Sequence, residues 1–316
     1  MEQRQLGRSS LKIAPLVLGT NVFGWTADEA TSFKVLDAFI DGGFNLIDTA
    51  DVYSRWVPGH KGGESETIIG KWLKQGGRRD KVVIGTKVGA ELGDDKKGLS
   101  PARIEQAVEE SLRRLQTDYI DLYQTHFDDL DTPVEVILET YAKLIKAGKV
   151  RVIGTSNMSP ERIMQSIQAS EQHGLPRYET LQPEYNLYDR QKFEREYLPI
   201  TTQYELGVIN YYGLASGFLS GKYRSKEDVN KSQRGQKALS YLDERGHNIL
   251  DTLDEVSKSY NTTPASVAIA WLVQNPAITA PIVSATKVEQ LEELFKGTEL
   301  NLDAAALEKL NIASDY

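Results

Sequence analysis

The chain has 316 residues, of which 40% are hydrophobic and 26% are charged, and its formal net charge is -8. This composition is that of an ordinary globular protein, and the acidic balance argues against a nucleic-acid or anionic-membrane partner, because such partners are bound by clustered Lys and Arg. Because the chain contains no cysteine, disulfides, thiolate metal sites, iron–sulfur clusters and cysteine nucleophiles are excluded.

Targeting and metal signals are also weak in this sequence. Residues 1–6 lack an apolar signal core, and no window is apolar for long enough to span a membrane. We therefore expect a cytoplasmic protein without a membrane segment. The histidines are too far apart in sequence to form a metal-binding pair, so no metal site is expected; they are His60, His126, His173 and His247. Nothing in the sequence fixes an oligomeric state.

Short strand-forming runs recur along the whole chain. Residues 3–13 contain two such stretches around the turn-like segment 7–10, which predicts a β-hairpin. Eight further apolar runs rich in strand-forming residues predict eight more strands. These runs lie at 16–18, 44–47, 82–84, 119–123, 150–153, 179–181, 208–210 and 278–283.

Helical patterns lie between the predicted strands. Ile104, Val108, Leu112 and Leu115 recur at a spacing that places them on one face of a helix, where they would pack against a sheet. The polar stretch 220–236 follows the seventh predicted strand and predicts an excursion from the pattern, either a solvated loop or a cover over a ligand.

Several predicted helices carry a start signal in which a capping hydroxyl precedes a proline. This pattern occurs at Ser100, Thr132, Ser159 and Thr263. Reciprocal capping boxes are also expected at 132–135 and 286–289.

The alternation of strands and helices predicts a parallel sheet, and eight such units favour closure into a barrel. A doubly wound sheet is the alternative, but it would carry a Gly-x-Gly-x-x-Gly turn after its first strand, and residues 19–24 lack that spacing. We therefore predict that residues 1–316 form one α/β domain, a (β/α)8 TIM barrel whose bottom is closed by the N-terminal β-hairpin.

Ionisable side chains follow three neighbouring predicted strands. Asp48, Lys87 and His126 each stand at or just after the end of a strand, and Tyr53 lies in the loop beyond Asp48. Taken singly, each has an ordinary explanation as a helix cap, a solvated lysine or a packed residue. Together at one mouth of a parallel barrel they indicate a site, because a buried Lys and a buried Asp are costly unless paired.

This set of residues suits the reduction of a carbonyl group. Hydride addition to a carbonyl needs a proton donor at its oxygen, and a tyrosine with a reference pKa of about 10 is a poor acid at neutral pH. Lys87 would favour ionisation of Tyr53, and Asp48 would keep Lys87 charged and oriented. His126 would donate a hydrogen bond to the substrate oxygen.

Three segments of the chain resemble the catalytic stretches of the aldo-keto reductase family, and the similarity extends from residues 6–9 to the last helix. These segments are 45–53, 84–87 and 121–126. The resemblance implies a TIM-barrel oxidoreductase that reduces a small-molecule aldehyde or ketone to an alcohol with NADPH.

The same resemblance implies a role for each candidate catalytic residue. Tyr53 would be the general acid and base, Asp48 and Lys87 would tune it, and His126 would orient the carbonyl group. Substrate walls are expected from aromatic residues on the loops at the mouth, namely Phe23, Trp25 and Trp56.

The resemblance also implies an extended cofactor site. At the nicotinamide the implied contacts are Ser156, Asn157, Gln182 and the stacking ring of Tyr211. At the pyrophosphate they are Leu214, Ser216 and Leu219, and Lys222 belongs to the loop that would fold over the cofactor. At the adenosine end they are Ser284, Thr286, Lys287, Gln290 and Glu293. A lysine at a helix N-terminus suits a 2′-phosphate, which favours NADPH over NADH. The chain departs from the family pattern at 212–213, 283–284 and Leu294.

Two other functions are compatible with the sequence. Lys87 would serve a Schiff-base lyase or aldolase if its amine were neutral, although a paired Asp48 argues against that state. The chain would also suit a cofactor-sensing regulatory subunit, since some relatives of this fold have that role.

Overall fold

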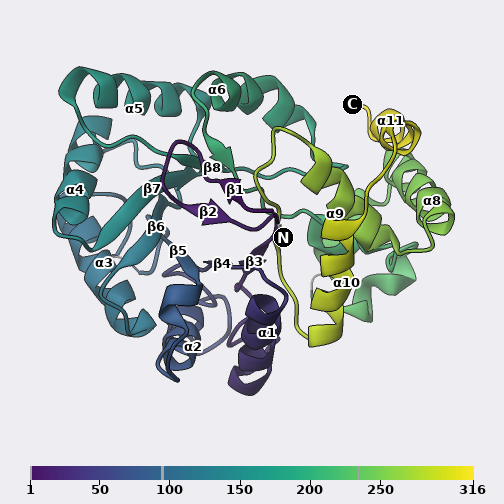
Figure 1. Cartoon of the computed structure of the whole chain (residues 1–316), viewed down its shortest axis with the longest axis horizontal. Helices are drawn as coiled ribbons and strands as arrows, with labels where there is room; N and C mark the ends of the chain where they lie inside the picture. Colours follow the sequence, from purple (N-terminus) through teal and green to yellow (C-terminus); the bar gives the residue numbers. More distant parts are fainter. Residues whose placement is uncertain (1, 94–95, 234) are drawn as a thin grey trace.

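Eight parallel strands form the centre of the molecule, and helices surround them (Figure 1). The computed structural model describes residues 2–93, 96–233 and 235–316. The strands of this sheet are β3 (Val17–Gly19), β4 (Leu46–Asp48), β5 (Val83–Val88), β6 (Ile120–Thr125), β7 (Val150–Ser156), β8 (Thr180–Gln182), β9 (Gly207–Val208) and β10 (Ile282–Val283). All eight predicted strands are therefore confirmed.

Helices alternate with the strands, which is the (β/α)8 arrangement that the sequence predicts. The longer helices are α1 (Glu29–Asp41), α2 (Glu64–Leu73), α3 (Pro101–Leu115), α4 (Val134–Lys146), α5 (Pro160–His173), α8 (Glu244–Ser259), α9 (Pro264–Gln274), α10 (Val288–Glu299) and α11 (Ala304–Ala313). Shorter helical segments are η1 (Arg79–Lys81), η2 (Phe193–Tyr197), α6 (Leu198–Gln203), η3 (Ala215–Ser220), η4 (Lys226–Lys231), α7 (Gly235–Ala238) and η5 (Leu239–Tyr241).

The sheet closes where its two edge strands meet. Strands pair in the order β10-β3-β4-β5-β6-β7-β8-β9, so β9 and β10 form the edges. The Thr279 N–H donates to Val208 O and the Ile282 N–H donates to Asn210 O, both at 2.8 Å. Arg4 supports this seam, because its guanidinium donates to Thr279 O at 3.0 Å.

Successive side chains of each strand point alternately into the barrel and outward to the helices. On β6, Leu122 belongs to the apolar cluster inside the barrel, whereas Tyr123 belongs to the larger cluster between sheet and helices. The predicted stripe on α3 is confirmed, because all four of its apolar side chains are buried in that larger cluster. The same alternation turns Lys87 inward and Thr86 outward on β5.

The N-terminal hairpin closes one end of the barrel, as the sequence predicts. It consists of β1 (Arg4–Gln5) and β2 (Lys12–Ile13), which are antiparallel, and it crosses the barrel axis in Figure 1. Its apolar side chains Leu6, Leu11 and Ile13 are buried and complete the interior cluster of the barrel. This end is the bottom of the barrel, opposite the carboxyl ends of the strands.

Three of the four predicted hydroxyl caps are confirmed. Ser100, Ser159 and Thr263 accept hydrogen bonds from the backbone N–H groups three residues ahead, at 3.4, 3.2 and 3.2 Å. Each of these helices begins with the proline that follows its cap. The local sequence therefore fixed where α3, α5 and α9 begin.

The two predicted capping boxes are wrong. Thr132 instead donates to Asp129 at 2.8 Å, and α4 begins only at Val134. Before α10, Gln290 Oε1 accepts the Thr286 N–H at 2.9 Å, which leaves Lys287 as the cap residue without a side-chain cap bond. In both places a neighbouring side chain takes the hydrogen bond of the threonine that the capping box would need: Asp129 binds the Thr132 hydroxyl, and Gln290 binds the Thr286 N–H.

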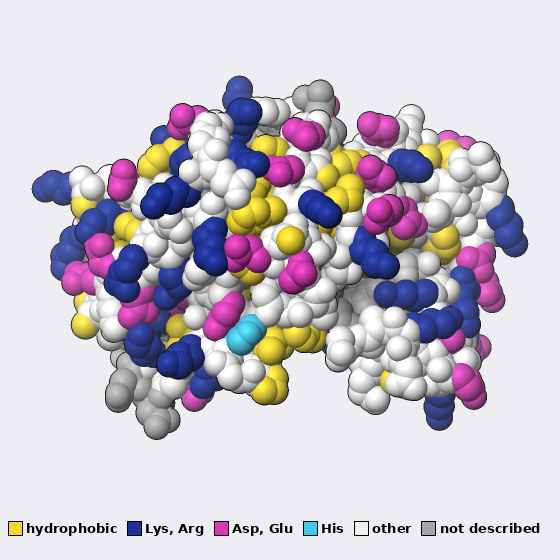
Figure 2. Space-filling view, turned by 90° about the horizontal axis from the view of Figure 1, so that it is seen from below, with side chains coloured by type: hydrophobic (Ala, Val, Ile, Leu, Met, Phe, Trp, Pro, Cys, Tyr) yellow, Lys and Arg dark blue, Asp and Glu magenta, His cyan; other side chains and the backbone are white. Residues whose placement is uncertain are grey.

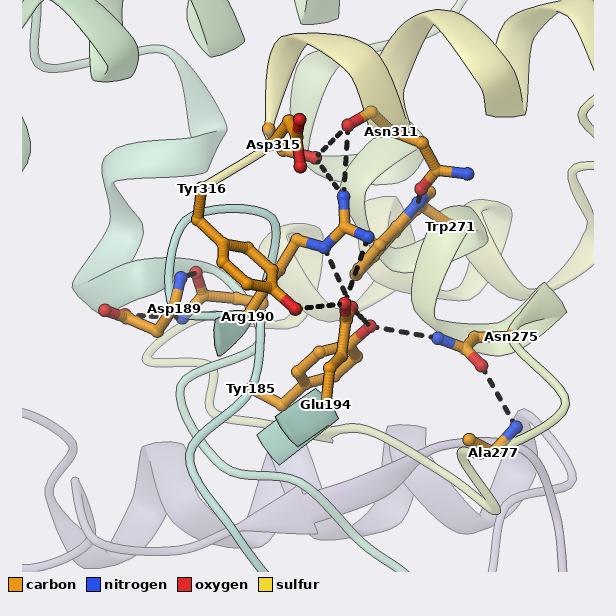
Figure 3. Close-up of polar contacts among 12 residues, drawn as sticks. Tyr185, Asp189, Arg190, Glu194, Trp271, Asn275, Ala277, Asn311, Asp315 and Tyr316 are labelled. Atoms are coloured by element: carbon orange, nitrogen blue, oxygen red, sulfur yellow. Dashed lines mark hydrogen bonds and ion pairs between the residues drawn. The ribbon is translucent and has the colours of Figure 1, made fainter. Parts of the chain in front are cut away.

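The predicted excursion 220–236 follows β9 and includes η4, although residue 234 lies outside the described residues. The end of the chain is held against the segment after β8 (Figure 3). Arg190 donates to Ser314 Oγ at 2.7 Å and to Glu194 at 2.8 Å, and Tyr316 Oη donates to Glu194 at 3.0 Å.

Basic and acidic side chains are interspersed on the face shown in Figure 2, with apolar side chains between them. Within the described ranges, no helix has both the length and the apolar character needed to cross a bilayer.

Candidate active site

The four predicted catalytic residues come together at the top of the barrel. Asp48 ends β4, Lys87 is the penultimate residue of β5, and His126 follows β6 directly. Lys87 Nζ donates to Asp48 Oδ2 at 2.6 Å and to Tyr53 Oη at 3.1 Å. The side chains of Lys87 and Asp48 are 0% and 2% exposed, so this ion pair is shielded from water.

Lys87 is held in its charged form. Its third hydrogen bond goes to Thr49 O at 2.8 Å, so all three ammonium protons have acceptors. Burial alone would lower the pKa of Lys87, but Asp48 and Tyr53 more than offset that effect, and its pKa is raised. A lysine that stays protonated is not a nucleophile, which argues against the Schiff-base alternative.

Tyr53 is a protonated phenol at neutral pH. Burial raises its pKa, the ammonium of Lys87 lowers it, and Asp48 raises it again, with a net increase. The expected influence of Lys87 is therefore present but smaller than the effect of burial. The result is a phenol that keeps its proton while lying against a cation that would stabilise its loss.

Two buried amides hold the other oxygen of Asp48. Gln124 Nε2 and Gln182 Nε2 donate to Asp48 Oδ1 at 3.1 and 3.0 Å, and Gln182 Nε2 also contacts Gln124 Oε1 at 3.2 Å. Gln124 was not among the candidates drawn from the sequence. The available signal was its place two residues before His126, at an inward position of a buried strand where a polar side chain needs partners.

His126 is neutral. Its pKa is well below the usual value because the ring is buried and because the charge of Lys87 opposes protonation. Its ring centroid lies 6.0 Å from that of Tyr53, and its Nδ1 is buried without a partner in the described part of the chain. A neutral imidazole donates a single hydrogen bond, which suits orientation of an acceptor oxygen rather than acid catalysis.

Four of the predicted cofactor residues adjoin the catalytic group. Ser156 Oγ donates to Gln182 O at 2.8 Å, and Asn157 Nδ2 donates to Ser156 Oγ at 3.1 Å. Tyr211 Oη donates to Asn157 Oδ1 at 3.2 Å. Since Gln182 also binds Asp48, this set of amides, hydroxyls and one aromatic ring is continuous with the predicted catalytic residues.

The segment after β9 has an unusual backbone. Tyr212, Ala215 and Ser216 have φ values of 55°, 46° and 58°, in the left-handed region that side chains disfavour. Such conformations gather at ligand-binding turns. Of the predicted cofactor contacts here, Ser216 is buried, Leu214 is half-buried, and Lys222 is exposed. Leu219 is fully buried in the core, so its side chain is not available to a ligand.

The predicted adenosine contacts lie around the start of α10. Ser284 Oγ donates to Asn21 at 2.9 Å, and Gln290 accepts from the Thr286 hydroxyl at 3.1 Å. Lys287 is exposed at the N-cap, where the helix dipole also favours an anion, while Glu293 lies further along the helix. An aromatic and amide-rich end together with a basic, phosphate-compatible end fits a nicotinamide dinucleotide.

Aromatic side chains surround the Tyr53 phenol. Trp56 contacts Tyr53 edge-on with centroids 6.0 Å apart, and it contacts Trp25 in the same manner at 5.8 Å. Phe127 stacks on His126 at 4.7 Å. Trp56 and Phe127 remain 47% and 46% exposed, so they present apolar surface beside the catalytic residues. Phe127 was not predicted, although its position next to His126 was the available signal.

Phe23, the third predicted substrate wall, does not lie at the mouth surface. Its ring is fully buried in the cluster between sheet and helices, and its carbonyl oxygen accepts a hydrogen bond from Ser54 Oγ at 2.7 Å. The prediction for Phe23 is therefore wrong: this ring anchors the loop from beneath. Among the described residues, no three His, Asp or Glu side chains gather into a possible metal site.

Comparison with known proteins agrees with this arrangement. A model of the aldo/keto reductase family matches residues 15–315. The chain is 38% identical to the oxidoreductase YrpG of Bacillus subtilis over 98% of its own length and 95% of the relative. It is 33% identical to the aldo-keto reductase YhdN of the same organism, over 98% and 93% of the two chains.

Another relative has a name of a different kind. The chain is 32% identical to a probable voltage-gated potassium channel subunit beta of Arabidopsis thaliana, over 95% and 92% of the two chains. The match of the family model to nearly the whole chain, together with the barrel and its polar mouth, leads to one conclusion: this chain belongs to the aldo/keto reductase family.

Proposed function

We propose that this oxidoreductase reduces an aldehyde or ketone to an alcohol with NADPH, and that Tyr53 donates the proton. The observation that carries the proposal is the hydrogen-bonded series Tyr53–Lys87–Asp48, which adjoins the amide and hydroxyl groups suited to a nicotinamide. A bound reduced nicotinamide would supply the hydride. Ser156, Asn157 and Gln182 would hold its carboxamide, and Tyr211 would support its ring.

The residues of the chain then transfer a single proton to the substrate. As negative charge develops on the carbonyl oxygen, the Tyr53 hydroxyl delivers its proton there, and Lys87 at 3.1 Å stabilises the resulting phenolate. Asp48 keeps Lys87 charged and fixed in place. Neutral His126 donates a hydrogen bond to the same substrate oxygen, which orients the carbonyl without competing for the proton.

The walls of the mouth favour a substrate with an apolar or aromatic body. Trp25, Trp56 and Phe127 offer ring edges and faces beside Tyr53, and such surfaces bind planar apolar groups well. Benzaldehyde is therefore a suitable first probe of turnover.

The substitution Tyr53→Phe tests the role of the phenol. It should lower the kcat for benzaldehyde reduction by about 100-fold or more, the usual contribution of a positioned acid, while fluorescence titration shows NADPH still binding. Tyr204→Phe is the matched control, because Tyr204 follows α6 at the bottom of the barrel and should keep the normal rate. A Tyr53→Phe enzyme with the normal rate would refute the assignment.

A different result would favour the other role found among relatives. If the unmodified chain binds NADPH but reduces none of a panel of aldehydes and ketones, catalysis is not its function. Sensing of the bound cofactor would then be the better proposal, in keeping with the relatives named as channel subunits.

The preference for NADPH over NADH rests on Lys287. Removing its charge with Lys287→Ala should raise the Kd for NADPH about tenfold, the loss expected for one charge-assisted contact, and should leave the Kd for NADH unchanged. Lys296→Ala, in the last turn of the same helix, is the control. Equal effects of Lys287→Ala on both coenzymes would contradict the assignment.

A further inference from the structure

A second group of buried charges lies behind the catalytic residues, on the outer side of β5. We call it the outer cluster; it consists of Asp51, Glu66, Arg103 and Arg114. Arg103 Nη2 donates to Asp51 Oδ2 at 2.8 Å, and Arg114 Nε donates to Glu66 Oε2 at 2.6 Å. Asp51, Glu66 and Arg103 are buried, so three of the four charges lie in the layer between the sheet and the helices.

The outer cluster touches both segments that carry the proton-transfer groups. Asp51 lies in the loop between Asp48 and Tyr53, and its backbone N–H donates to Lys87 O at 3.3 Å. Glu66 Oε1 accepts from Thr86 Oγ1 at 2.6 Å, one residue before Lys87 on the opposite face of the strand. The loop of Tyr53 and the strand of Lys87 are therefore both attached to the same set of charges.

The helices that supply these charges pack closely against one another. A Cβ added to Gly70 on α2 would lie 2.0 Å from Arg114 O on α3, so glycine is needed for the two helices to approach. The N-terminus of α3 is itself fixed by the Ser100 cap. Arg103 thus reaches Asp51 from a rigid support, which is what a positioning contact requires.

Stability alone does not account for the Asp51–Arg103 pair. A buried ion pair is often no more stabilising than apolar residues of the same size, because both charges lose their hydration. In this pair Asp51 Oδ1 and Arg103 Nε and Nη1 are buried without partners in the described part of the chain, which adds to the cost. A costly contact two residues from Tyr53 calls for a role at that residue.

We infer that Asp51 and Arg103 are positioning residues, which hold the loop of Tyr53 so that its hydroxyl stays in hydrogen-bond contact with Lys87. Arg103 on α3 binds the side chain of Asp51, and this contact holds Asp51 where its backbone N–H can donate to Lys87 O. Neither side chain touches the reacting atoms, so both act through Tyr53. This inference rests on the proposed function for its effect on catalysis, but not for its effect on the titration of Tyr53.

An apolar replacement of both partners separates positioning from stability. Arg103→Met alone should lower the Tm, because it leaves the Asp51 carboxyl buried without its hydrogen-bond partner. The double variant Asp51→Leu/Arg103→Met should recover a Tm near that of the unmodified chain, since no uncompensated charge remains. Its kcat for benzaldehyde with NADPH should still be about tenfold to a hundredfold lower, the usual effect of a small misplacement, with little change in KM.

The titration of Tyr53 gives a readout that needs no substrate. Ultraviolet difference spectra between each protein and its own Tyr53→Phe counterpart isolate this one phenol. Since Lys87 lowers the pKa of Tyr53, a loosened contact in the double variant should move that pKa upward. If the unmodified chain reduces no carbonyl, the proposed function fails, while this titration still decides the present inference.

Two comparisons complete the test. Arg103→Lys keeps a cation opposite Asp51 and should retain a higher kcat than Arg103→Met, even if the double variant does not fold. Arg79→Met/Asp121→Asn alters a partly buried Arg–Asp pair, 2.7 Å apart, at the opposite end of the sheet, where Asp121 also binds Arg151, and it should leave the Tyr53 titration unmoved. An unchanged Tyr53 pKa and kcat in a folded double variant, or equal kcat for Arg103→Lys and Arg103→Met, would overturn the inference.

Discussion

At the scale of single residues, the hydrogen bonds of the Asp48 carboxylate hold the side chains of the site in place. Asp48 accepts hydrogen bonds from an ammonium on one oxygen and from two amides on the other. We therefore expect Gln124 to contribute to catalysis without approaching the substrate, because it holds the carboxylate that binds Lys87. Its amide also meets Gln182, so the predicted nicotinamide contact and the proton-transfer group are parts of one network.

The substitution Gln124→Met would remove one donor from Asp48 while keeping the volume of the side chain. We expect kcat for benzaldehyde to fall about tenfold, the effect of losing a hydrogen bond to a charged group, with an unchanged KM because residue 124 does not contact substrate. Steady-state kinetics on protein with normal circular dichroism measures this. Gln124→Glu should be worse, since it sets a second carboxylate against Asp48. Normal kcat in both variants would show that Gln182 suffices.

The ionisable members of the site were predictable from the residues themselves, and Ser156, Asn157 and Gln182 were named from the family resemblance, whereas Gln124 and Arg103 were not predicted. Asp48, Lys87 and His126 stand at strand ends, where a charged side chain is conspicuous. Gln124 reads as one polar residue within a strand, and its importance appears only when the barrel brings Gln182 beside it. Arg103 reads as part of the solvated face of a helix, because sequence periodicity does not reveal that the loop of Tyr53 covers it.

At the scale of elements, start signals were reliable where the cap had no competitor. Ser100, Ser159 and Thr263 cap α3, α5 and α9 as predicted, since each hydroxyl finds only the free N–H groups of its own helix. Thr132 and Thr286 failed because Asp129 and Gln290 bind them instead. Both competitors lie within four residues of the threonine they bind, but they stand outside the four positions of the capping box, so the box pattern does not register them.

For the strands too, the sequence predicts the features that depend on local residues but not those that depend on contacts between distant segments. Their number and order followed from apolar runs, but β9 and β10 are only two residues long in the structure. The inner face of β7 depends on a contact that no pattern predicts. A Cβ on Gly154 would lie 2.0 Å from Thr180 Oγ1, so this glycine leaves room inside the barrel for the Thr180 side chain.

At the scale of the whole molecule, the outer cluster makes stability depend on pH. Burial and the nearby Glu66 raise the pKa of Asp51 to about 7, although Arg103 and Arg114 oppose this. The charged and titratable groups that face Asp51 from the packed elements are Glu66, Arg103, Glu110, Arg114, Tyr123 and Tyr141. The folded protein therefore binds the Asp51 proton more strongly than the unfolded chain does.

This difference predicts how the free energy of unfolding changes with pH. The unfolded carboxyl releases its proton near pH 4 and the folded one near pH 7, so Asp51 should make stability fall as pH rises through this window, by up to about 1.4 kcal/mol per pH unit. Urea titrations from pH 4 to pH 8 measure the slope. Asp51→Asn should make the free energy of unfolding less dependent on pH, because residue 51 then no longer titrates. The stability lost by leaving Arg103 without its carboxylate is the same at every pH in this range. Parallel curves for the two proteins would contradict the prediction.

The closure of the barrel between β9 and β10 affects how this chain folds during its synthesis. The ring closes only when the backbone around Val208 and Asn210 meets that around Thr279 and Ile282, and Arg4 reaches across to the same place. A polypeptide emerging from the ribosome thus exposes an unfinished edge until residue 282 is available. Nascent chains paused before that point would offer unpaired strand backbone to one another, so their exposure to aggregation is greatest before residue 282 emerges.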